Sequence, residues 1–419
     1  MSQGCPDTGT TRTTYVVTGA AGFLGWHTRA RLALDPGARV VPVGRPEWTP
    51  DGLDAALTGG ATTAGATTGG GGSAADVVLH VAGINRGSDD ELEAGNVALA
   101  AELVAALERT GARPTVVVAG SNYADGDHPG CDTPYGRGKR GAGELLRAWG
   151  ERVGARVTEI RFPGLFGEHG RPDYNSFVAT FAHRVATGGQ PQVVGDRELP
   201  LVAVQDAVAM LLDAASGGGA GDPGVPRVLR PEGHRVAISA VAARLRELHD
   251  CYAPAGDIPD LRGPFDIALF NTLRAALWQA NGTTVFSPTA HRDERGSLVE
   301  TIRVHDGGGQ AFLSTTNPGH VRGNHVHLHK IERFCVVGGR GLIRLRRVLT
   351  EDVVEIPVCG EQPTIVDMPT LWTHSITNVG DEPLVTFFWV DELFDPARPD
   401  TYPLAVLDGP DRPRGQGGT

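Results

Sequence analysis

Near its start the chain reads Tyr15-Val16-Val17-Thr18-Gly19-Ala20-Ala21-Gly22-Phe23-Leu24-Gly25, in which a β-branched run leads through a glycine-rich turn into a helical pattern. The three glycines have the spacing GxxGxxG. A sharp strand-to-helix turn, and the close approach of backbone N–H groups to a pyrophosphate, both require residues without side-chain bulk. The stretch therefore predicts a dinucleotide site formed by Gly19, Gly22, Phe23, Leu24 and Gly25. In a chain with 58 glycines, the alternative is a glycine-rich turn without a ligand.

Strand-like and helical patterns alternate through the first half of the chain. The short β-branched runs are Tyr15–Thr18, Arg39–Val43, Asp76–Val81 and Thr115–Ala119, and each is followed by a helical pattern or a loop. This alternation predicts an α/β fold with a doubly wound parallel sheet.

The pattern changes in the last third of the chain. From about Val285 the sequence has many short strand-like runs, separated by Gly, Asn and Asp turns, with little helical periodicity. This pattern predicts an antiparallel sandwich or a small barrel. We place the boundary in the helical, Pro-containing region Asp260–Asn281, and therefore expect a first domain of residues 1–280 and a second of residues 281–419.

Composition excludes several classes of protein. The chain has 38 basic and 49 acidic residues, a net charge of −11, which argues against a surface for nucleic acid or for an anionic membrane. Its five cysteines form no CxxC pair, and no apolar run is long enough to span a bilayer. Met1–Thr14 lacks the basic and apolar regions of a signal peptide. We expect a reduced, soluble, cytoplasmic protein.

The end of the second strand-like run favours one nicotinamide cofactor over the other. An acidic side chain there would bind the ribose 2′-hydroxyl of NAD, whereas this chain has Val43-Gly44-Arg45 and no carboxylate before Glu47. A guanidinium suits the 2′-phosphate of NADPH. The alternative is a solvated arginine in a loop.

A catalytic set is suggested by Tyr135-x-x-x-Lys139, which opens a helical pattern shortly after Ser121. Residues i and i+4 share one helix face, so the phenol and the ammonium are neighbours. We expect the lysine charge to lower the pKa of Tyr135, so that the phenol exchanges a proton with a substrate oxygen that Ser121 also binds.

These residues resemble the extended short-chain dehydrogenase/reductases. In that family a motif similar to His80-Val81-Ala82-Gly83 passes close to the cofactor, and an asparagine like Asn96 completes the catalytic set. The resemblance thus adds His80, Ala82 and Gly83 to the cofactor site. Members that dehydrate sugars carry an acidic pair after the catalytic hydroxyl; Asn122 and Tyr123 stand there in this chain, which disfavours dehydration.

The last third of the chain contains a candidate metal site. From Gly319 it reads Gly-x5-His325-x-His327-x4-Glu332-x6-Gly339, which resembles the first cupin motif, and His374 lies in a partly kept second motif that has Leu371 where many cupins have glycine. Three imidazoles and one carboxylate suit zinc or another first-row divalent ion. A metal-free barrel, in which the histidines bind substrate, is the alternative. His329 is a spare ligand that we expect to be exposed.

A second cupin feature lies upstream. Arg292–Glu300 resembles the D-x-R-G-x-F-x-E signature of epimerase cupins that act on deoxysugar nucleotides, with leucine in place of the aromatic residue. An arginine such as Arg295, facing into the barrel, would pair with a pyrophosphate. A salt bridge that stabilises a turn is the alternative.

Over nearly its full length the chain resembles the bifunctional capsular-polysaccharide enzymes of the CapF type. The matching stretches include Arg161–Gly167, Arg171–Ser176, Arg197–Leu201 and Phe394–Tyr402. The resemblance implies a homodimer whose RmlC-like cupin inverts carbon 3 of a UDP-2-acetamido-2,6-dideoxy-4-ketohexose. The reductase domain then uses NADPH to make UDP-2-acetamido-2,6-dideoxy-L-talose, on the way to N-acetyl-L-fucosamine. It also implies substrate contacts by Arg161, Arg171, Asn175 and Arg197.

Other readings of the same residues remain open. The sequence does not separate a UDP-linked from a dTDP-linked sugar. The chain could be a reductase alone, with the cupin as a binding or dimerisation module, or an epimerase that keeps NAD bound. The stretch before Tyr135 is longer than in the family, and Gly164 stands where relatives commonly have asparagine, so a related deoxysugar pathway is a further alternative.

Overall fold

The computed structural model describes residues 12–60, 73–217, 222–282, 284–294, 296–306 and 308–407. The chain divides into two compact units. The first comprises Met1–Leu165 and Pro200–His234, and the second comprises Phe166–Leu199 and Arg235–Thr419.

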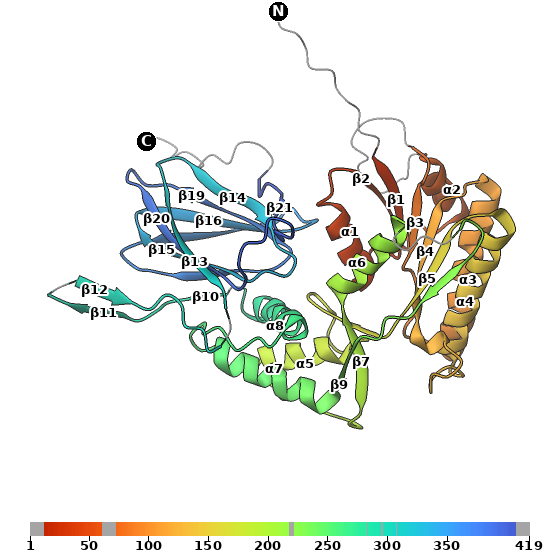
Figure 1. The fold of residues 1–419 in the computed structure, drawn as a ribbon, viewed down its shortest axis with the longest axis horizontal. Helices are drawn as coiled ribbons and strands as arrows, with labels where there is room; N and C mark the ends of the chain where they lie inside the picture. Colours follow the sequence, from red (N-terminus) through yellow and green to blue (C-terminus); the bar gives the residue numbers. More distant parts are fainter. Residues whose placement is uncertain are drawn as a thin grey trace, which may run out of the picture. The chain divides into compact units, whose positions relative to one another are not determined.

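The first unit is built on a six-stranded sheet with the order β2-β1-β3-β4-β5-β8, in which every pairing is parallel (Figure 1). The strand order reverses between β1 and β3, and in such sheets ligands bind at the carboxyl ends of the strands beside the reversal. The doubly wound parallel sheet expected from the sequence is therefore confirmed. The strands are β1 (Thr13–Thr18), β2 (Ala38–Val43), β3 (Val77–His80), β4 (Thr115–Ser121), β5 (Val157–Phe162) and β8 (Arg227–Leu229).

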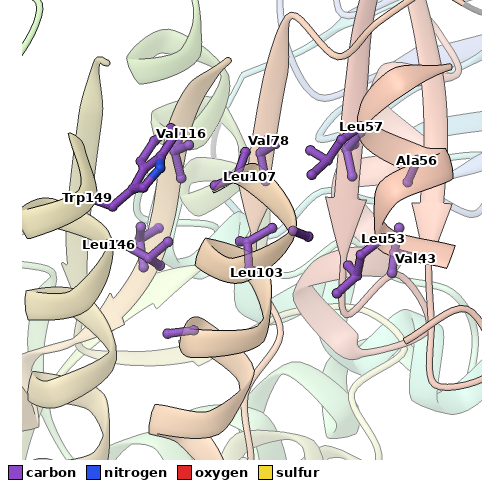
Figure 2. Close-up of a cluster of buried hydrophobic side chains, with 14 of the residues drawn as sticks. Val43, Leu53, Ala56, Leu57, Val78, Leu103, Leu107, Val116, Leu146 and Trp149 are labelled. Atoms are coloured by element: carbon purple, nitrogen blue, oxygen red, sulfur yellow. The ribbon is translucent and has the colours of Figure 1, made fainter. Parts of the chain in front are cut away.

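Three helices, α2, α3 and α4, pack on one face of this sheet. Figure 2 shows Leu103 and Leu107 of α3 and Trp149 of α4, which belong to one buried cluster with Val78 and Val116 of the sheet. Each fully buried leucine contributes about 1.5–3 kcal/mol relative to an exposed one, so this face anchors α4, the helix that carries Tyr135 and Lys139.

The other face is covered by α1 and α6, whose Leu32 and Leu211 share a second buried cluster with Leu79 of the sheet. The helices of this unit, and one short 3₁₀ turn, are α1 (Phe23–Leu32), α2 (Pro50–Thr58), α3 (Asp89–Thr110), η1 (Asn122–Ala124), α4 (Pro134–Val153) and α6 (Val204–Ala215).

The second unit contains two five-stranded sheets with the orders β10-β18-β15-β20-β13 and β17-β16-β19-β14-β21. The strands of both sheets pair antiparallel, as the sequence predicted. Phe334, Ile343, Ile376 and Phe388 form a core shared by both sheets. The strands are β10 (Val285–Phe286), β13 (Gln310–Thr316), β14 (Val321–Val326), β15 (Glu332–Gly338), β16 (Arg340–Arg347), β17 (Val353–Cys359), β18 (Ile365–Met368), β19 (Trp372–Asn378), β20 (Leu384–Val390) and β21 (Tyr402–Pro403), with a separate hairpin of β11 (Ala290–Asp293) and β12 (Gly296–Val299).

Helices α5 (Phe177–Ala186), α7 (Ile238–Tyr252) and α8 (Pro264–Asn281) belong to the same unit as these strands. A buried ion pair helps to join them: Arg333 of β15 donates to both oxygens of Asp367 in β18, at 2.6 and 2.8 Å, and the Tyr252 hydroxyl of α7 donates to Asp367 at 2.7 Å. Trp278 of α8 enters the β core. The two units thus differ from the expected division at residue 280, and the assignment of folding domains stays a prediction.

A three-stranded sheet, β6 (Gly164–Phe166), β7 (Glu198–Ala203) and β9 (His234–Ala237), contains the points at which the chain passes from one unit to the other. Within the described ranges, none of the helices has the length and apolar character needed to cross a membrane.

Candidate active site and metal centre

The glycine-rich turn after β1 packs so closely against neighbouring backbone that it leaves no room for side chains at two of its glycines. Gly19 has φ 64°, and a Cβ at this position would lie 2.7 Å from the Ala82 Cα. A Cβ at Gly25 would lie 2.2 Å from the Gly19 carbonyl oxygen. Helix α1 begins at Phe23 with Gly22 as its N-cap, a residue without a capping side chain. This turn presents backbone N–H groups at a helix N-terminus, which fits the pyrophosphate of a dinucleotide.

The loop after β3 lies beside this turn and is fixed by Asn96. The Asn96 amide accepts from the Ile84 N–H at 3.0 Å, and it donates to the carbonyls of Ile84 and Leu92 at 2.9 and 2.7 Å. A Cβ on Gly83 would lie 3.2 Å from the Lys139 Nζ and 3.3 Å from the Asn96 Oδ1. Asn96 and Gly83 therefore flank Lys139, and in this structure Asn96 holds the loop rather than a reacting group.

His80, at the end of β3, is buried and neutral. Its Nδ1 lies 3.0 Å from the Thr18 hydroxyl. Burial, together with the nearby charge of Lys139, lowers the pKa of His80 to about 3. His80 therefore links β1 to β3 without adding charge to the cofactor site.

Ser121, Tyr135 and Lys139 converge at the end of β4. The Tyr135 phenol is hydrogen-bonded to the Ser121 hydroxyl. The Lys139 ammonium donates to the Ala119 carbonyl at 2.9 Å. Helix α4 begins here because Thr133 caps it, accepting from the Gly136 N–H, and Pro134 occupies its first turn. The structure thus brings together three of the four side chains that were predicted as catalytic, and the fourth, Asn96, holds the neighbouring loop.

The pKa values of this set differ from the sequence expectation. Tyr135 and Lys139 keep some exposed surface, but their titrating groups are surrounded by protein. Burial raises the pKa of Tyr135, and its hydrogen bond with Ser121 offsets this only partly. Burial also lowers the pKa of Lys139 to about 8, against the opposing charge of Glu159. The raised pKa of Tyr135 in the chain alone is therefore opposite to the lowered pKa expected from the sequence, because burial outweighs the hydrogen bond with Ser121.

Beneath this set lies a buried carboxylate that the sequence reasoning missed. The Glu159 carboxylate pairs with the Nε atoms of Arg161 at 2.9 Å and of Arg147 at 3.2 Å. A Cβ on either Gly120 or Gly143 would lie 2.8 Å from this carboxylate. Those two glycines leave room for it beside β4 and α4. The sequence did contain a signal for this carboxylate, because Glu159 and Arg161 are charged residues in the middle of a strand-like run.

Arg161, expected to contact substrate, lies in this buried network. Its Nη1 also pairs with Asp125 at 2.6 Å, and Arg230 binds the same carboxylate at 2.8 Å. The network holds the segment that follows Ser121. The substrate contact of Arg161 stays a prediction.

Arg45, expected to bind the 2′-phosphate, is exposed just after β2. The first carboxylate after that strand belongs to Glu47 and accepts from the Gly44 N–H at 2.8 Å. Glu47 is thus engaged by the turn itself, which fits the expected preference for NADPH.

The remaining expected substrate residues belong to the second unit. Arg171, Asn175 and Arg197 are exposed, and the Arg171 guanidinium lies 5.1 Å from the centre of the Tyr174 ring. Their contact with substrate stays a prediction. Arg295 lies outside the described residues.

In the second unit, His325, His327, Glu332 and His374 converge as predicted. One ligand atom from each lies within 4.8 Å of the others. The Nε2 atoms of His325 and His374 are 3.1 Å apart, and the Glu332 Oε2 lies 2.9 Å from the His374 Nε2 and 3.0 Å from the His327 Nε2. Ligands about 2 Å from one zinc ion lie roughly 3.3 Å from each other in a tetrahedron. The spacing of these atoms therefore fits one first-row divalent ion.

Local backbone geometry places two of these ligands opposite each other. A β-bulge in β14 between Gly323 and His325 brings His325 into register with His374 on β19. Leu371, which replaces the glycine of many cupins, is buried and adopts φ 65°. The backbone conformation that glycine would favour is thus kept by a leucine.

The protonation states of His374 and Glu332 suit a metal ion, whereas for His327 burial is outweighed by the hydrogen bond to Glu332, which raises the pKa. Burial lowers the pKa of His374 to about 4, so its imidazole is neutral at pH 7. Burial opposes the charge on Glu332, but hydrogen bonds from the three histidines hold its pKa well below the usual range. Metals bind neutral imidazoles and ionised carboxylates. The His325 side chain is 24% exposed, which leaves one approach from solvent, whereas His329 is exposed as expected and is absent from the cluster.

Comparisons with known proteins match two different parts of the chain to two families. Residues 15–224 match the NAD dependent epimerase/dehydratase family, and residues 291–402 match the polysaccharide biosynthesis C-terminal domain. The chain is 31% identical over 396 residues to the UDP-2-acetamido-2,6-beta-L-arabino-hexul-4-ose reductase of Pseudomonas aeruginosa, covering 94% of this chain and 99% of the relative. It is 32% identical to the crystal structure of the capsular polysaccharide assembling protein CapF from Staphylococcus aureus, with 94% and 100% coverage and a TM-score of 0.56.

The chain belongs to the CapF family. A second CapF structure, with the inhibitor 3-isopropenyl-tropolone, matches at 30% identity, 94% and 100% coverage and a TM-score of 0.52. In this chain, a region of the NAD dependent epimerase/dehydratase family precedes a polysaccharide biosynthesis C-terminal domain.

Proposed function

We propose that the chain is a bifunctional enzyme acting on a UDP-2-acetamido-2,6-dideoxy-4-ketohexose. Its C-terminal β region, a cupin, inverts carbon 3, and its first unit reduces the carbon-4 ketone with NADPH to give UDP-2-acetamido-2,6-dideoxy-L-talose for surface polysaccharide. One observation carries the proposal. A chain that matches a hexul-4-ose reductase over 94% of its length holds both a Ser–Tyr–Lys set and a separate cluster of three histidines and a glutamate. The relative's name favours UDP over dTDP.

The reduction uses the residues around Tyr135. NADPH, when bound at the Gly19–Gly25 turn, supplies a hydride to carbon 4. Tyr135 donates its phenolic proton to the oxygen on carbon 4, and Ser121 hydrogen-bonds the same oxygen. Lys139, held at the Ala119 carbonyl, stabilises the phenolate that remains. The ketone gains one hydride and one proton, and becomes an alcohol.

Epimerisation must come before reduction. The proton on carbon 3 is acidic only while carbon 4 is a ketone, because the enolate oxygen takes up the negative charge. His325, His327, Glu332 and His374 hold a divalent ion, of which zinc fits the ligands best. The ion would supply positive charge that stabilises the enolate oxygen. Alternatively, it would have a structural role and fix the shape of the barrel. Lys330, His329 and Tyr402 are candidates for the proton carrier.

The test uses the full-length protein in deuterium oxide with the UDP-linked 4-ketosugar. Without NADPH, we expect one deuterium at carbon 3; with NADPH, one equivalent is consumed for each ketone. NADPH consumption without deuterium incorporation would instead identify a reductase whose cupin is a binding module. Tightly bound NAD and no net consumption would identify an epimerase. Adding a chelator then decides whether the metal serves the exchange or only the fold.

A further inference from the structure

The turn between β14 and β15 determines whether Glu332 can join the histidines. Strand residues alternate between faces, so His325 and His327 share a face from which Glu332, five residues after His327, would point away. Residues 328–331 must therefore leave the strand pattern. Their backbone N–H groups lose the strand partners that would normally satisfy them, and all four need other acceptors.

Two carboxylates from one distant segment accept all four N–H groups. Asp400 accepts from Leu328 through Oδ1 at 3.1 Å, and from His329 and Lys330 through Oδ2 at 2.9 and 2.8 Å. Asp391 accepts from Ile331 at 2.9 Å. Successive backbone N–H groups around a carboxylate form an anion-binding nest. Here the anion is a side chain of the same protein.

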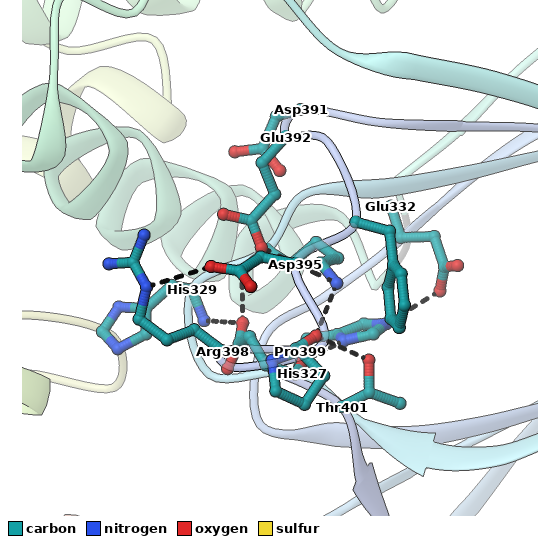
Figure 3. A network of polar contacts seen from close by, with 12 residues as sticks. His327, His329, Glu332, Asp391, Glu392, Asp395, Arg398, Pro399 and Thr401 are labelled. Carbon is teal, nitrogen blue, oxygen red and sulfur yellow. Dashed lines mark hydrogen bonds and ion pairs between the residues drawn. The ribbon is translucent and has the colours of Figure 1, made fainter.

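We call residues 391–404 the C-terminal strap. Figure 3 shows part of it, including Glu392, Pro399 and Thr401, in the same polar network as His327 and Glu332. Lys330 is mostly buried and donates its ammonium to the Pro399 carbonyl at 2.7 Å. Strand β21 of the strap pairs with His325 and Val326 of β14. The strap thus contacts the metal-binding segment on both sides of the turn.

Asp400 makes one more contact, through its backbone. The His327 Nδ1 lies 2.6 Å from the Asp400 carbonyl oxygen. A carbonyl can only accept, so Nδ1 carries the hydrogen and the Nε2 lone pair is left for the ligand cluster. Outer contacts of this kind orient metal-binding histidines and commonly alter metal affinity 10- to 100-fold.

We propose that Asp400 is a positioning residue of the metal centre. Its carboxylate fixes the turn that brings Glu332 to the histidines, and its carbonyl selects the tautomer of His327. Docking of the strap and binding of the ion are therefore coupled, and by reciprocity the ion tightens the strap. This inference rests on the proposed metal site and deepens it, since it adds a residue 68 positions beyond Glu332 to that site.

The test measures the affinity of the full-length protein for zinc by competition with a chromophoric chelator. Asp400→Asn keeps the size of the side chain but replaces one acceptor oxygen with an N–H donor that faces other donors. We expect zinc to bind roughly 10- to 100-fold more weakly. The matched control is Asp395→Asn in the same strap, since Asp395 contacts the Ala397 N–H at 2.9 Å and the exposed Arg398. We expect its zinc affinity to match that of the unchanged protein.

A second readout does not depend on zinc. In the metal-free protein, Asp400→Asn should speed hydrogen exchange at residues 328–330, and in the unchanged protein zinc should slow exchange there and in residues 399–404. NADPH binding reports that the first unit of each variant is folded, and slow hydrogen exchange in β15, β16 and β19 reports that the second unit is folded. If Asp400→Asn does not fold, Asp391→Ala, which removes the side-chain acceptor of the Ile331 N–H, should weaken zinc binding by a smaller factor.

The outcomes separate the two proposals. An unchanged protein that binds no zinc would refute the proposed metal site. Zinc binding that is tight in the unchanged protein and equally tight in Asp400→Asn, with unaltered exchange at residues 328–330, would refute the role of Asp400 alone.

Discussion

The two candidate sites are assembled over very different lengths of chain. The cofactor turn is complete within Gly19–Gly25, and Tyr135 and Lys139 lie one helical turn apart. The metal ligands extend from His325 to His374, and the carboxylate that holds their turn is Asp400. A site made by contiguous residues is specified by its own sequence motif, whereas a dispersed site depends on elements that reach it from elsewhere. We therefore expect the cofactor site to lose activity through steric changes within its own motif. The metal site should lose its ion through changes at residues far away in the sequence.

The largest effect we predict concerns Glu159, a residue outside the short motifs of the reductase site that supports the segment after Ser121. Glu159→Gln removes the buried carboxylate that pairs with Arg161 and Arg147, and leaves Arg161 with Asp125. Breaking a buried ion pair from one side costs about 3–5 kcal/mol, so the first unit should melt at a clearly lower temperature, as followed by calorimetry. Glu93→Gln is the control, because its pair with Arg137 is exposed and worth at most about 1 kcal/mol. Equal stability of the two variants would contradict this account.

A smaller effect should come from the turn itself. Gly25→Ala places a Cβ 2.2 Å from the Gly19 carbonyl oxygen, and α1 must shift to accept it. Such overpacking costs about 1–3 kcal/mol, and we expect NADPH affinity, measured by fluorescence titration, to fall more than tenfold. Gly22→Ala meets the same oxygen at 3.2 Å and should be milder. If Gly22→Ala bound NADPH more weakly than Gly25→Ala, contact with the Gly19 carbonyl oxygen would not be what limits side chains in this turn.

The reductase should also depend on pH in a way that the exchange reaction does not. Burial lowers the pKa of Lys139 to about 8, so kcat/KM for NADPH oxidation should fall about tenfold per pH unit above that value. Between pH 8 and 10.5 the unfolded chain binds more protons at this lysine than the folded one. The lysine's contribution to the free energy of unfolding therefore rises with pH in this window, while activity falls. A flat reductase profile up to pH 10 would count against Lys139 as the active cation.

The smallest effect concerns cofactor choice. Arg45 is exposed, so its pairing with a 2′-phosphate should contribute about 1 kcal/mol. Arg45→Ala should therefore reduce the preference for NADPH over NADH roughly fivefold to tenfold in kcat/KM, and raising the salt concentration should reduce the preference of the unchanged enzyme. An unaltered preference would remove Arg45 from the cofactor site.

These differences also explain what the sequence could predict. The parallel sheet, the glycine turn and the Tyr135–Lys139 pair follow from periodicity and short spacing. The four metal ligands were visible because a motif spaces three of them closely. Glu159 and Asp400 were not visible as site residues, since each acts through contacts with segments that no local pattern links to it. For the same reason, the grouping of α7 with the β sheets was not foreseen: Tyr252 and Asp367 are 115 positions apart.

The central claim is that one chain carries two separable reactions, and two variants test it most directly. With the UDP-linked 4-ketosugar in deuterium oxide, Tyr135→Phe should lower NADPH oxidation by a factor of about 10²–10⁴ and leave deuterium incorporation at carbon 3 intact. His374→Ala should show the reverse loss: it should abolish incorporation while the first unit still binds NADPH and reduces a ketosugar that is already inverted at carbon 3. If Tyr135→Phe abolished both reactions, or if the unchanged protein oxidised NADPH without incorporating deuterium at carbon 3, the two-site account would be contradicted.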